Sequence, residues 1–239
     1  MSSQSQPQTK REVDAVVERY ARRQSGSLYS ILRPEVMLST QELQRQILVM
    51  LGSVCGYTDV DLRELDLVDV GCGYGGHLLD FLRFGFAPAK LRGIELLPDR
   101  AAAARTRLPA DVWIHEGDAS SAGLQPASQD IVFQSVVFSS LLDDDFQKEL
   151  AQQMWSWVKP GGGVLWYDFV YGNPSNPDVR GVPARRIRAL FPDGRMTVRR
   201  LTLAPPISRR VCRIHPAAYH LFNRMPFLRT HVLCWIHKS

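Results

Sequence analysis

The chain has 239 residues, of which 45% are hydrophobic and 22% are charged, and its formal net charge is +5. These values are ordinary for a soluble globular protein with one large domain, or with a domain and an appendage. No apolar run reaches the roughly 18 to 20 residues that a membrane span needs, and the polar start of the chain lacks the apolar stretch of a signal peptide.

The charge is distributed unevenly along the chain. The stretch from Arg180 to Ser239 contains thirteen Lys or Arg and a single acid, Asp193, which gives it a net charge of +12. Because the whole chain carries +5, residues 1–179 have a net charge of −7. A strongly basic last quarter indicates either a polyanionic or acidic partner or a solvated basic face.

The first sixty residues predict a tail and a helical cap. Residues 1–12 are polar, and we expect a disordered tail there. Residues 13–60 form the expected cap, with helices over 12–23 and 40–51 joined by an irregular connection.

From Leu65 onward, strand-like runs alternate with helical stretches, a rhythm that predicts a parallel α/β sheet within residues 61–239. The expected strands are 65–70, 91–97, 112–118, 130–138, 163–171, 196–203 and 231–237. The expected helices are 75–86, 99–108, 144–158 and 183–191, and KPGGG (159–163) is expected to stop a helix. Residues 205–229 form an insertion before the last strand, and we expect it on the acceptor side.

A glycine turn follows the first of these strands. In VDVGCGYGG the acid Asp69 precedes glycines 71, 73, 75 and 76, and an apolar helix begins directly afterwards. Glycine permits positive φ and a close approach to the backbone, so this turn predicts a nucleotide-binding corner. Glu95 ends the second strand, where a carboxylate can accept both ribose hydroxyls, and Asp118 ends the third, where it can receive an adenine amino group.

These residues resemble the class I S-adenosylmethionine-dependent methyltransferases. VDVGCGYG is similar to their first motif, Glu95 to the ribose-binding acid, and GDAS (117–120) to the motif on the adenine side. WVKPGGGVLWYDF is similar to the helix, turn and fifth strand that follow, so the resemblance covers residues 65–171. It implies a Rossmann-like methyltransferase fold, that is, a doubly wound α/β fold with a seven-stranded, mostly parallel sheet whose last strand is antiparallel. It also implies an N-terminal helical lid.

The cofactor that the resemblance implies is S-adenosylmethionine, with S-adenosylhomocysteine as its product. The family pattern places the amino group of the methionine tail near Asp69 and the glycine backbone. The residues assigned to the cofactor in this way are Asp69, Gly71, Cys72, Gly73, Gly75, Glu95, Leu96, Asp118, Ala119 and Gln134. A nicotinamide dinucleotide is the weaker alternative, because it leaves Asp118 without a role.

Motifs that mark macromolecular acceptors are missing. The run after the fourth strand, FQSVVFSSLLDD, lacks the paired prolines of nucleic-acid amino methyltransferases, and the chain has no Pro-Cys nucleophile for cytosine carbon methylation. The paired glutamates of protein arginine methyltransferases have no counterpart either. The segment from residue 167 onward resembles bacterial methyltransferases of polysaccharide and other specialised biosynthetic pathways. That resemblance implies O-methylation of a hydroxyl on a sugar, glycan or small metabolite.

The basic last quarter fits an acceptor that bears phosphate, pyrophosphate or carboxylate, such as a lipid-linked glycan. The residues that we expect to contact it are Arg180, Arg209, Arg210, Arg213 and Tyr219. A weakly acidic hydroxyl needs a general base, and His215 and Asp168 are the catalytic candidates. His77 and His115 are expected to be structural.

A metal site is not expected. The aspartates at 143–145 precede a helix, so helix capping accounts for them better than a metal does. The cysteines are scattered without zinc-site spacing, at Cys55, Cys72, Cys212 and Cys234. Such thiols are typical of a reducing compartment, so we expect a cytoplasmic protein, with at most a peripheral association at the inner face of a membrane.

Two other function classes stay open. The basic tail would also suit an RNA-binding methyltransferase, although nucleic acid is the less favoured partner. The fold could instead serve as a non-catalytic scaffold, but a scaffold has no use for the intact set of acids and glycines at the predicted corner. The sequence makes no prediction of oligomeric state.

Overall fold

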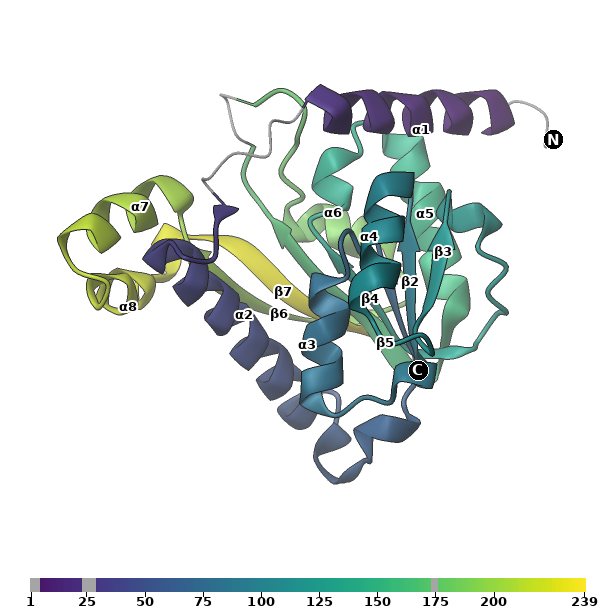
Figure 1. Cartoon of the computed structure of the whole chain (residues 1–239), viewed down its shortest axis with the longest axis horizontal. Helices are drawn as coiled ribbons and strands as arrows, with labels where there is room; N and C mark the ends of the chain where they lie inside the picture. Colours follow the sequence, from purple (N-terminus) through teal and green to yellow (C-terminus); the bar gives the residue numbers. More distant parts are fainter. Residues whose placement is uncertain (1–4, 23–28, 173–175) are drawn as a thin grey trace.

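The structure is a computed structural model that describes residues 5–22, 29–172 and 176–239. Its centre is a seven-stranded sheet in the order β3-β2-β1-β4-β5-β7-β6 (Figure 1). The strands are β1 (Leu67–Val70), β2 (Leu91–Glu95), β3 (Trp113–Glu116), β4 (Gln129–Ser135), β5 (Val158–Phe169), β6 (Arg195–Leu203) and β7 (Arg229–His237). Neighbouring strands are parallel except for β7, which is antiparallel to both β5 and β6. This sheet confirms the predicted doubly wound, mostly parallel fold.

Helices cover both faces of the sheet. On one face lie α2 (Pro34–Ser53), α3 (Gly76–Phe84) and α4 (Pro98–Arg107), and on the other lie α5 (Asp144–Trp157) and α6 (Ala184–Leu190). Single-turn 3₁₀ helices span Tyr57–Asp59, Leu62–Glu64, Pro88–Lys90, Ala119–Ser121, Phe138–Ser140 and Pro226–Leu228. Because β1 is covered on both sides, all four of its residues are buried, as expected for a central parallel strand.

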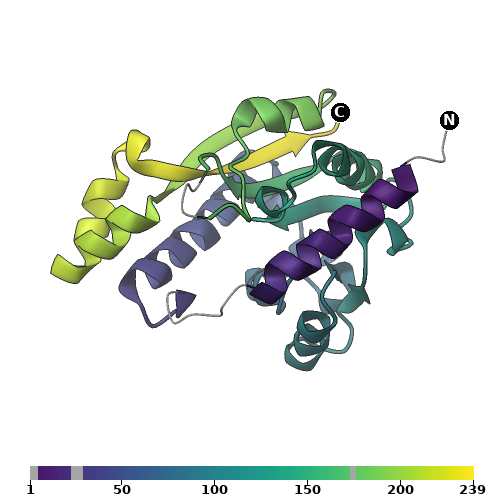
Figure 2. The ribbon, with the colours of Figure 1, turned by 90° about the horizontal axis from the view of Figure 1, so that it is seen from above.

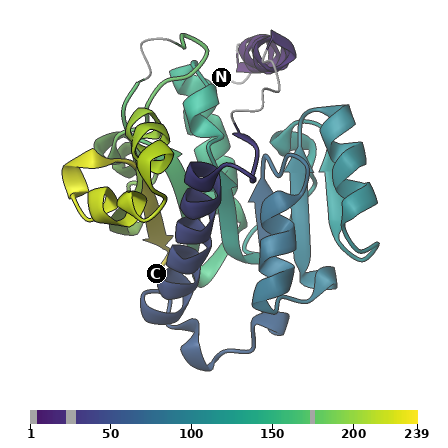
Figure 3. The same cartoon turned by 60° about the vertical axis from the view of Figure 1, so that its left-hand side comes forward.

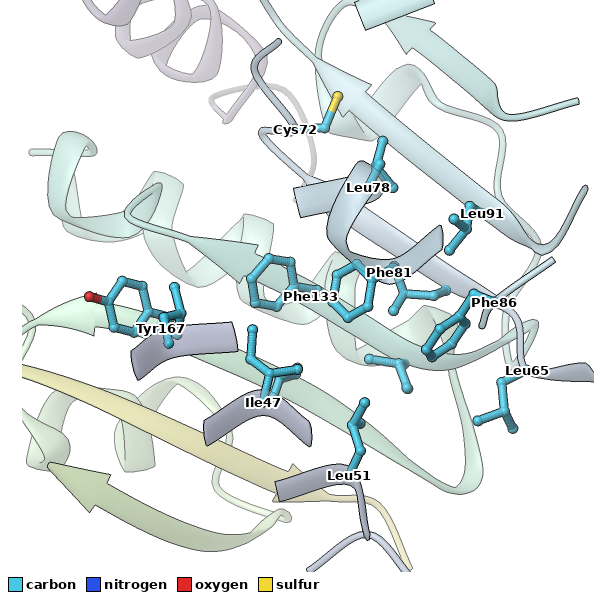
Figure 4. Close-up of a cluster of buried hydrophobic side chains, with 14 of the residues drawn as sticks. Ile47, Leu51, Leu65, Cys72, Leu78, Phe81, Phe86, Leu91, Phe133 and Tyr167 are labelled. Atoms are coloured by element: carbon cyan, nitrogen blue, oxygen red, sulfur yellow. The ribbon is translucent and has the colours of Figure 1, made fainter. Parts of the chain in front are cut away.

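The core on the α2–α4 face is built from aromatic and aliphatic side chains (Figure 4). The ring of Phe81 on α3 meets those of Phe133 on β4 and Phe86 edge to face, with centroids 5.3 and 5.4 Å apart. From α2, Ile47 and Leu51 pack into the same cluster. This packing fixes α3, and with it the turn between β1 and α3.

The N-terminal segment differs from its prediction. α1 (Ser5–Arg22) already begins at Ser5, so the expected disordered tail is wrong for residues 5–12, and residues 1–4 lie outside the described part. α2 begins at Pro34 rather than at residue 40, because proline at the first helical position has no N–H to leave unsatisfied. α5 ends at Trp157, just before KPGGG, as expected of a helix stop, and KPGGG itself belongs to β5.

α1 crosses above the sheet at the carboxyl ends of the parallel strands, as the view from above shows (Figure 2). A buried ion pair fixes it there: Arg19 Nη2 donates to Glu12 Oε1 at 2.6 Å and to the carbonyl oxygen of Ser140 at 3.1 Å. The N–H of Leu142 donates to the same glutamate oxygen at 2.9 Å. α1 is therefore attached to the loop that follows β4.

The insertion between β6 and β7 consists of α7 (Pro205–Ile214) and α8 (Ala218–Asn223). The two helices project beside α2, which separates them from α3 (Figure 3). Glu42 on α2 accepts hydrogen bonds from the hydroxyl of Tyr219, the side-chain amide of Asn223 and the N–H of Thr202. None of the helices in the described residues combines the length and hydropathy that crossing a membrane requires.

Candidate active site

The strand order changes direction at β1, which pairs with β2 on one side and β4 on the other. The chain therefore leaves these two central strands toward opposite faces and opens a crevice beyond their carboxyl ends. In open α/β sheets, ligands bind at this position. The residues after β1 and β4 are accordingly the first candidates for a binding site.

The glycine turn after β1 has a backbone that only glycine adopts without strain. Gly71, Gly73 and Gly75 have φ angles of 73°, 57° and 78°, in the left-handed region. A Cβ on Gly71 would lie 2.5 Å from Val137 Cγ2, whereas a Cβ on Gly73 would meet nothing within 4 Å. The turn thus packs closely against the loop after β4 at one glycine and has open space at the other.

Asp69 lies immediately before this turn and is 1% exposed. Neither of its carboxylate oxygens has a hydrogen-bond partner among the described residues. Burial raises its pKa to about 7, against the opposing charge of nearby His77 and with a further rise from Glu95. A buried carboxylate without a donor is costly, and a cationic ligand group in the crevice would remove that cost.

Glu95, at the end of β2, is 5% exposed and holds the glycine turn. Its Oε2 accepts from the N–H of Gly73 at 2.8 Å, and its Oε1 accepts from the N–H of Leu97 at 2.9 Å. Each oxygen keeps a second lone pair that can accept a further hydrogen bond. Its carboxylate therefore lies against the turn, where the resemblance places the ribose.

The other residues assigned to the cofactor have diverse surroundings. Asp118 caps a 3₁₀ turn, with Oδ1 accepting from the N–H of Ser120 at 2.6 Å. Cys72 is buried, while Leu96 and Ala119 are half-buried. Gln134 is fully buried, and both ends of its side-chain amide form hydrogen bonds.

The Gln134 side chain shapes the loop after β4 rather than facing solvent. Its Nε2 donates to the carbonyl oxygen of Tyr167 at 3.2 Å, and its Oε1 accepts from the N–H of Val137 at 3.0 Å. Val136, which lies between Gln134 and Val137 in the chain, has a φ of 59°. A positive φ is rare for a β-branched residue. Such strain persists only where the surroundings enforce it, and it is frequent at functional sites.

The structure separates the two catalytic candidates. Asp168 is fully buried, where its two oxygens accept from the N–H groups of Ser139 and Phe169 at 3.1 and 2.9 Å, and burial raises its pKa to about 7. His215 is exposed at the end of α7, where its Nδ1 accepts from the N–H of Ala217 at 3.1 Å. Neither of them lies in the crevice between β1 and β4 as an accessible proton acceptor.

His77, which the sequence analysis expects to be structural, lies at the crevice. Its Nε2 is 3.1 Å from Ser135 Oγ at the end of β4, and its Nδ1 is 3.8 Å from Asp80 Oδ2. The imidazole stays 31% exposed and packs edge to face on Phe133. Its place beside the glycine turn was the only signal in the sequence, because Ser135 is 58 residues away.

The residues expected to contact the acceptor do not form one group. Arg180 pairs with Asp144 at the start of α5, whereas the other three arginines, at 209, 210 and 213, lie on α7. Tyr219 is 1% exposed and donates its hydroxyl hydrogen to Glu42 at 2.8 Å, so it packs inside the insertion.

Helix capping accounts for the aspartate run. Asp143 Oδ1 accepts from the N–H groups of Asp145 and Phe146, both at 2.8 Å. Among the described residues, no group of three or more His, Cys, Asp or Glu side chains could hold a metal ion.

α1 and the glycine turn meet through one arginine. The Arg100 guanidinium lies 4.5 Å from the ring centroid of Tyr20 on α1 and 5.4 Å from that of Tyr74 in the turn. Cation–π contacts of this kind contribute about 0.5–2 kcal/mol.

The residues of the crevice fit S-adenosylmethionine. The unpartnered carboxylate of Asp69 complements a cationic group, and the open space at Gly73 admits a ligand close to the backbone. The Glu95 carboxylate has acceptor capacity left for hydroxyl groups.

Comparison with known proteins agrees with this fit. Residues 67–162 match a family profile described as "Methyltransferase domain", and no curated protein matches the sequence. The fold is similar to that of an S-adenosylmethionine-dependent methyltransferase from Archaeoglobus fulgidus, with 15% identity, 81% and 94% of the two chains covered and a TM-score of 0.56. It is also similar to the magnesium protoporphyrin IX methyltransferase of Synechocystis PCC 6803 with bound S-adenosylmethionine, with 12% identity, 93% and 91% coverage and a TM-score of 0.57.

A third similar structure is the phosphoethanolamine N-methyltransferase 2 of Haemonchus contortus, in complex with phosphomonomethylethanolamine and S-adenosylhomocysteine. It has 17% identity and a TM-score of 0.53, with 73% of this chain and 49% of that chain covered. The sheet order, the residues of the crevice and the profile match agree: residues 67–162 match a methyltransferase domain, and the chain has the fold of S-adenosylmethionine-dependent methyltransferases.

Proposed function

We propose that the enzyme transfers the methyl group of S-adenosylmethionine to a hydroxyl oxygen of a sugar, glycan or small metabolite. The observation that carries this proposal is the half-exposed imidazole of His77, held 3.1 Å from Ser135 Oγ at the carboxyl end of β4. Methyl transfer to an alcohol gains from a general base, whereas a neutral amine needs none. A histidine titrates near neutral pH and suits that role.

In this proposal the crevice residues divide the work. Asp69 receives the ammonium group of the methionine tail, Glu95 receives the ribose hydroxyls, and Asp118 lies on the adenine side. His77 accepts the proton of the acceptor hydroxyl. When bound, the cofactor supplies the electrophilic methyl group, and the protein holds the acceptor oxygen in line with it in a site closed to water.

The acceptor that we propose carries a negative charge from phosphate or carboxylate, as in a nucleotide-linked or lipid-linked sugar. The basic last quarter of the chain supports an anionic acceptor. The Haemonchus relative offers a precedent, since its complex contains a phosphate-bearing small molecule.

The first test measures binding and transfer separately. Isothermal titration calorimetry with S-adenosylhomocysteine should give tight binding to the wild type and none to Glu95→Ala. Radiolabelled S-adenosylmethionine should then label hydroxyl-bearing sugar phosphates in the wild type, and His77→Gln should lose this transfer while keeping cofactor binding. His215→Gln is the matched control and should behave as the wild type.

Two results would contradict the proposal. Transfer that persists in His77→Gln would remove this residue as the base, and labelling of amines in place of hydroxyls would refute O-methylation. RNA binding whose affinity falls steeply with salt concentration, together with methylation of the RNA bases, would favour the RNA-binding alternative.

A further inference from the structure

A cavity of about 620 Å³ lies at the outer edge of the sheet, against the edge strand β6. Its walls come from α2, β6, α8 and the first residue of β7. Five arginines line it, Arg45, Arg199, Arg200, Arg224 and Arg229. None of them belongs to the set that the sequence analysis expected to bind an anion.

These five arginines have no carboxylate partners among the described residues. In the part of the chain that the structure describes, none of them forms an ion pair. Two other arginines of the basic last quarter, Arg180 and Arg186, do form ion pairs, both with Asp144. Like charges gathered in one concave surface repel each other, and an anion in the cavity would relieve that repulsion.

Glu42, the acid in the lining, does not neutralise the arginines. Its Oε2 accepts from the Tyr219 hydroxyl at 2.8 Å and from the N–H of Thr202 at 3.2 Å, and its Oε1 accepts from Asn223 Nδ2 at 2.6 Å. Both oxygens are thus engaged in joining α2 to α8 and β6. In the described residues, neither oxygen lies within ion-pair distance of an arginine.

The wall of the cavity is held in place before any ligand arrives. Arg229 Nε donates to the carbonyl oxygen of Asn223 at 2.6 Å, and its Nη1 donates to that of Arg200 at 3.0 Å. Arg199 Nη1 donates to Gln46 Oε1 at 3.3 Å. Arginines oriented in this way lose less side-chain freedom when they bind a ligand.

We propose that this cavity is an anion-binding site for a compact ligand that bears phosphate or pyrophosphate. The guanidinium fork matches the geometry of phosphate oxygens, and a cavity of about 620 Å³ has room for a compact anion among the five arginines. β6 is three strand spacings from β4, about 14 Å, so the cavity is separate from the crevice. The inference does not depend on which acceptor the enzyme methylates.

The test is a titration of the full chain with inorganic pyrophosphate at a fixed salt concentration. Isothermal titration calorimetry measures the binding. The variants are Arg45→Gln and Arg224→Gln, because both side chains are exposed and donate no hydrogen bond within the described residues. The control is Arg188→Gln on α6, an exposed arginine that makes the same charge change outside the cavity. Thermal midpoints of all variants without ligand check that they fold.

We expect saturable binding of one pyrophosphate per chain, about tenfold weaker in each cavity variant and unchanged in the control. Bound pyrophosphate should also raise the thermal midpoint of the wild type. Absence of saturable binding would overturn the inference, and so would an equal loss in Arg188→Gln, which would reflect net charge alone. Single-stranded RNA that binds more tightly than pyrophosphate, with a steep salt dependence, would overturn it in favour of an extended nucleic-acid surface.

Discussion

Cofactor binding should depend on pH through Asp69. This carboxyl group is buried without a donor, and burial raises its pKa to about 7. If the cofactor ammonium binds the ionised form, binding lowers that pKa and releases a proton. A group with a pKa of about 7 is about 90% protonated at pH 6 and about 10% protonated at pH 8, so the affinity should rise about tenfold between them.

The assay is isothermal titration calorimetry with S-adenosylhomocysteine, which carries the same ammonium group and is not consumed. Titrations at pH 6 in two buffers with different ionisation enthalpies should reveal about 0.9 proton released per ligand. At pH 8 the release should fall to about 0.1.

Two variants identify the group responsible. Asp69→Asn should bind more weakly and with no rise in affinity between pH 6 and pH 8. His77 also affects the charge of Asp69, so His77→Gln should keep the rise in affinity between the two pH values if the Asp69 carboxyl group causes it. Equal wild-type affinities at the two pH values, without proton release, would refute the assignment of Asp69 to the ammonium group.

Three further predictions concern stability. Gly71→Ala would combine a φ of 73° with a Cβ 2.5 Å from Val137 Cγ2, so it should lower the free energy of unfolding by about 1–3 kcal/mol in urea titrations; unchanged stability would contradict the geometry. Arg100→Ala removes the guanidinium 4.5 Å from the ring of Tyr20 and should speed amide exchange in α1 with little change elsewhere. Exchange at the wild-type rate would mean that this contact does not hold α1. Asp168→Ala leaves two backbone N–H groups without an acceptor and should cost about 1–3 kcal/mol. The pKa of this carboxyl is raised to about 7, so its contribution to stability falls as pH rises from about 4 to about 7. The difference in unfolding free energy should therefore be larger at pH 5 than at pH 8.

The parts of the fold that could be predicted are those encoded locally. β1, the glycine turn and α3 lie within about twenty consecutive residues, and the hydrophobic pattern, the acid and the glycines all indicate the same structure. The N-terminal helix boundaries were less predictable. The polar composition of residues 5–12 favours a tail, whereas the structure has them in α1, and the apolar pattern of α2 is weak before residue 40.

The site could be predicted only where its residues follow consecutive strands. The ends of β1 and β2 are adjacent in both chain and sheet, so Asp69 and Glu95 could be paired from the sequence. The contact between His77 and Ser135 requires the reversal of strand order at β1, which no local pattern specifies. The arginine cavity combines α2 with three elements more than 140 residues later, and it depends on how the insertion folds back.

Glu42 has a consequence for protein engineering. Its carboxylate joins α2 to β6 and to α8 by three hydrogen bonds. α2 and the late insertion therefore form one unit despite their separation in the chain. Replacing residues 205–229 with the insertion of a relative would remove Tyr219 and Asn223, and the Glu42 carboxylate would keep only the N–H of Thr202 as a donor. Chimeras designed to exchange specificity should therefore transfer residues 34–53 and 205–229 together.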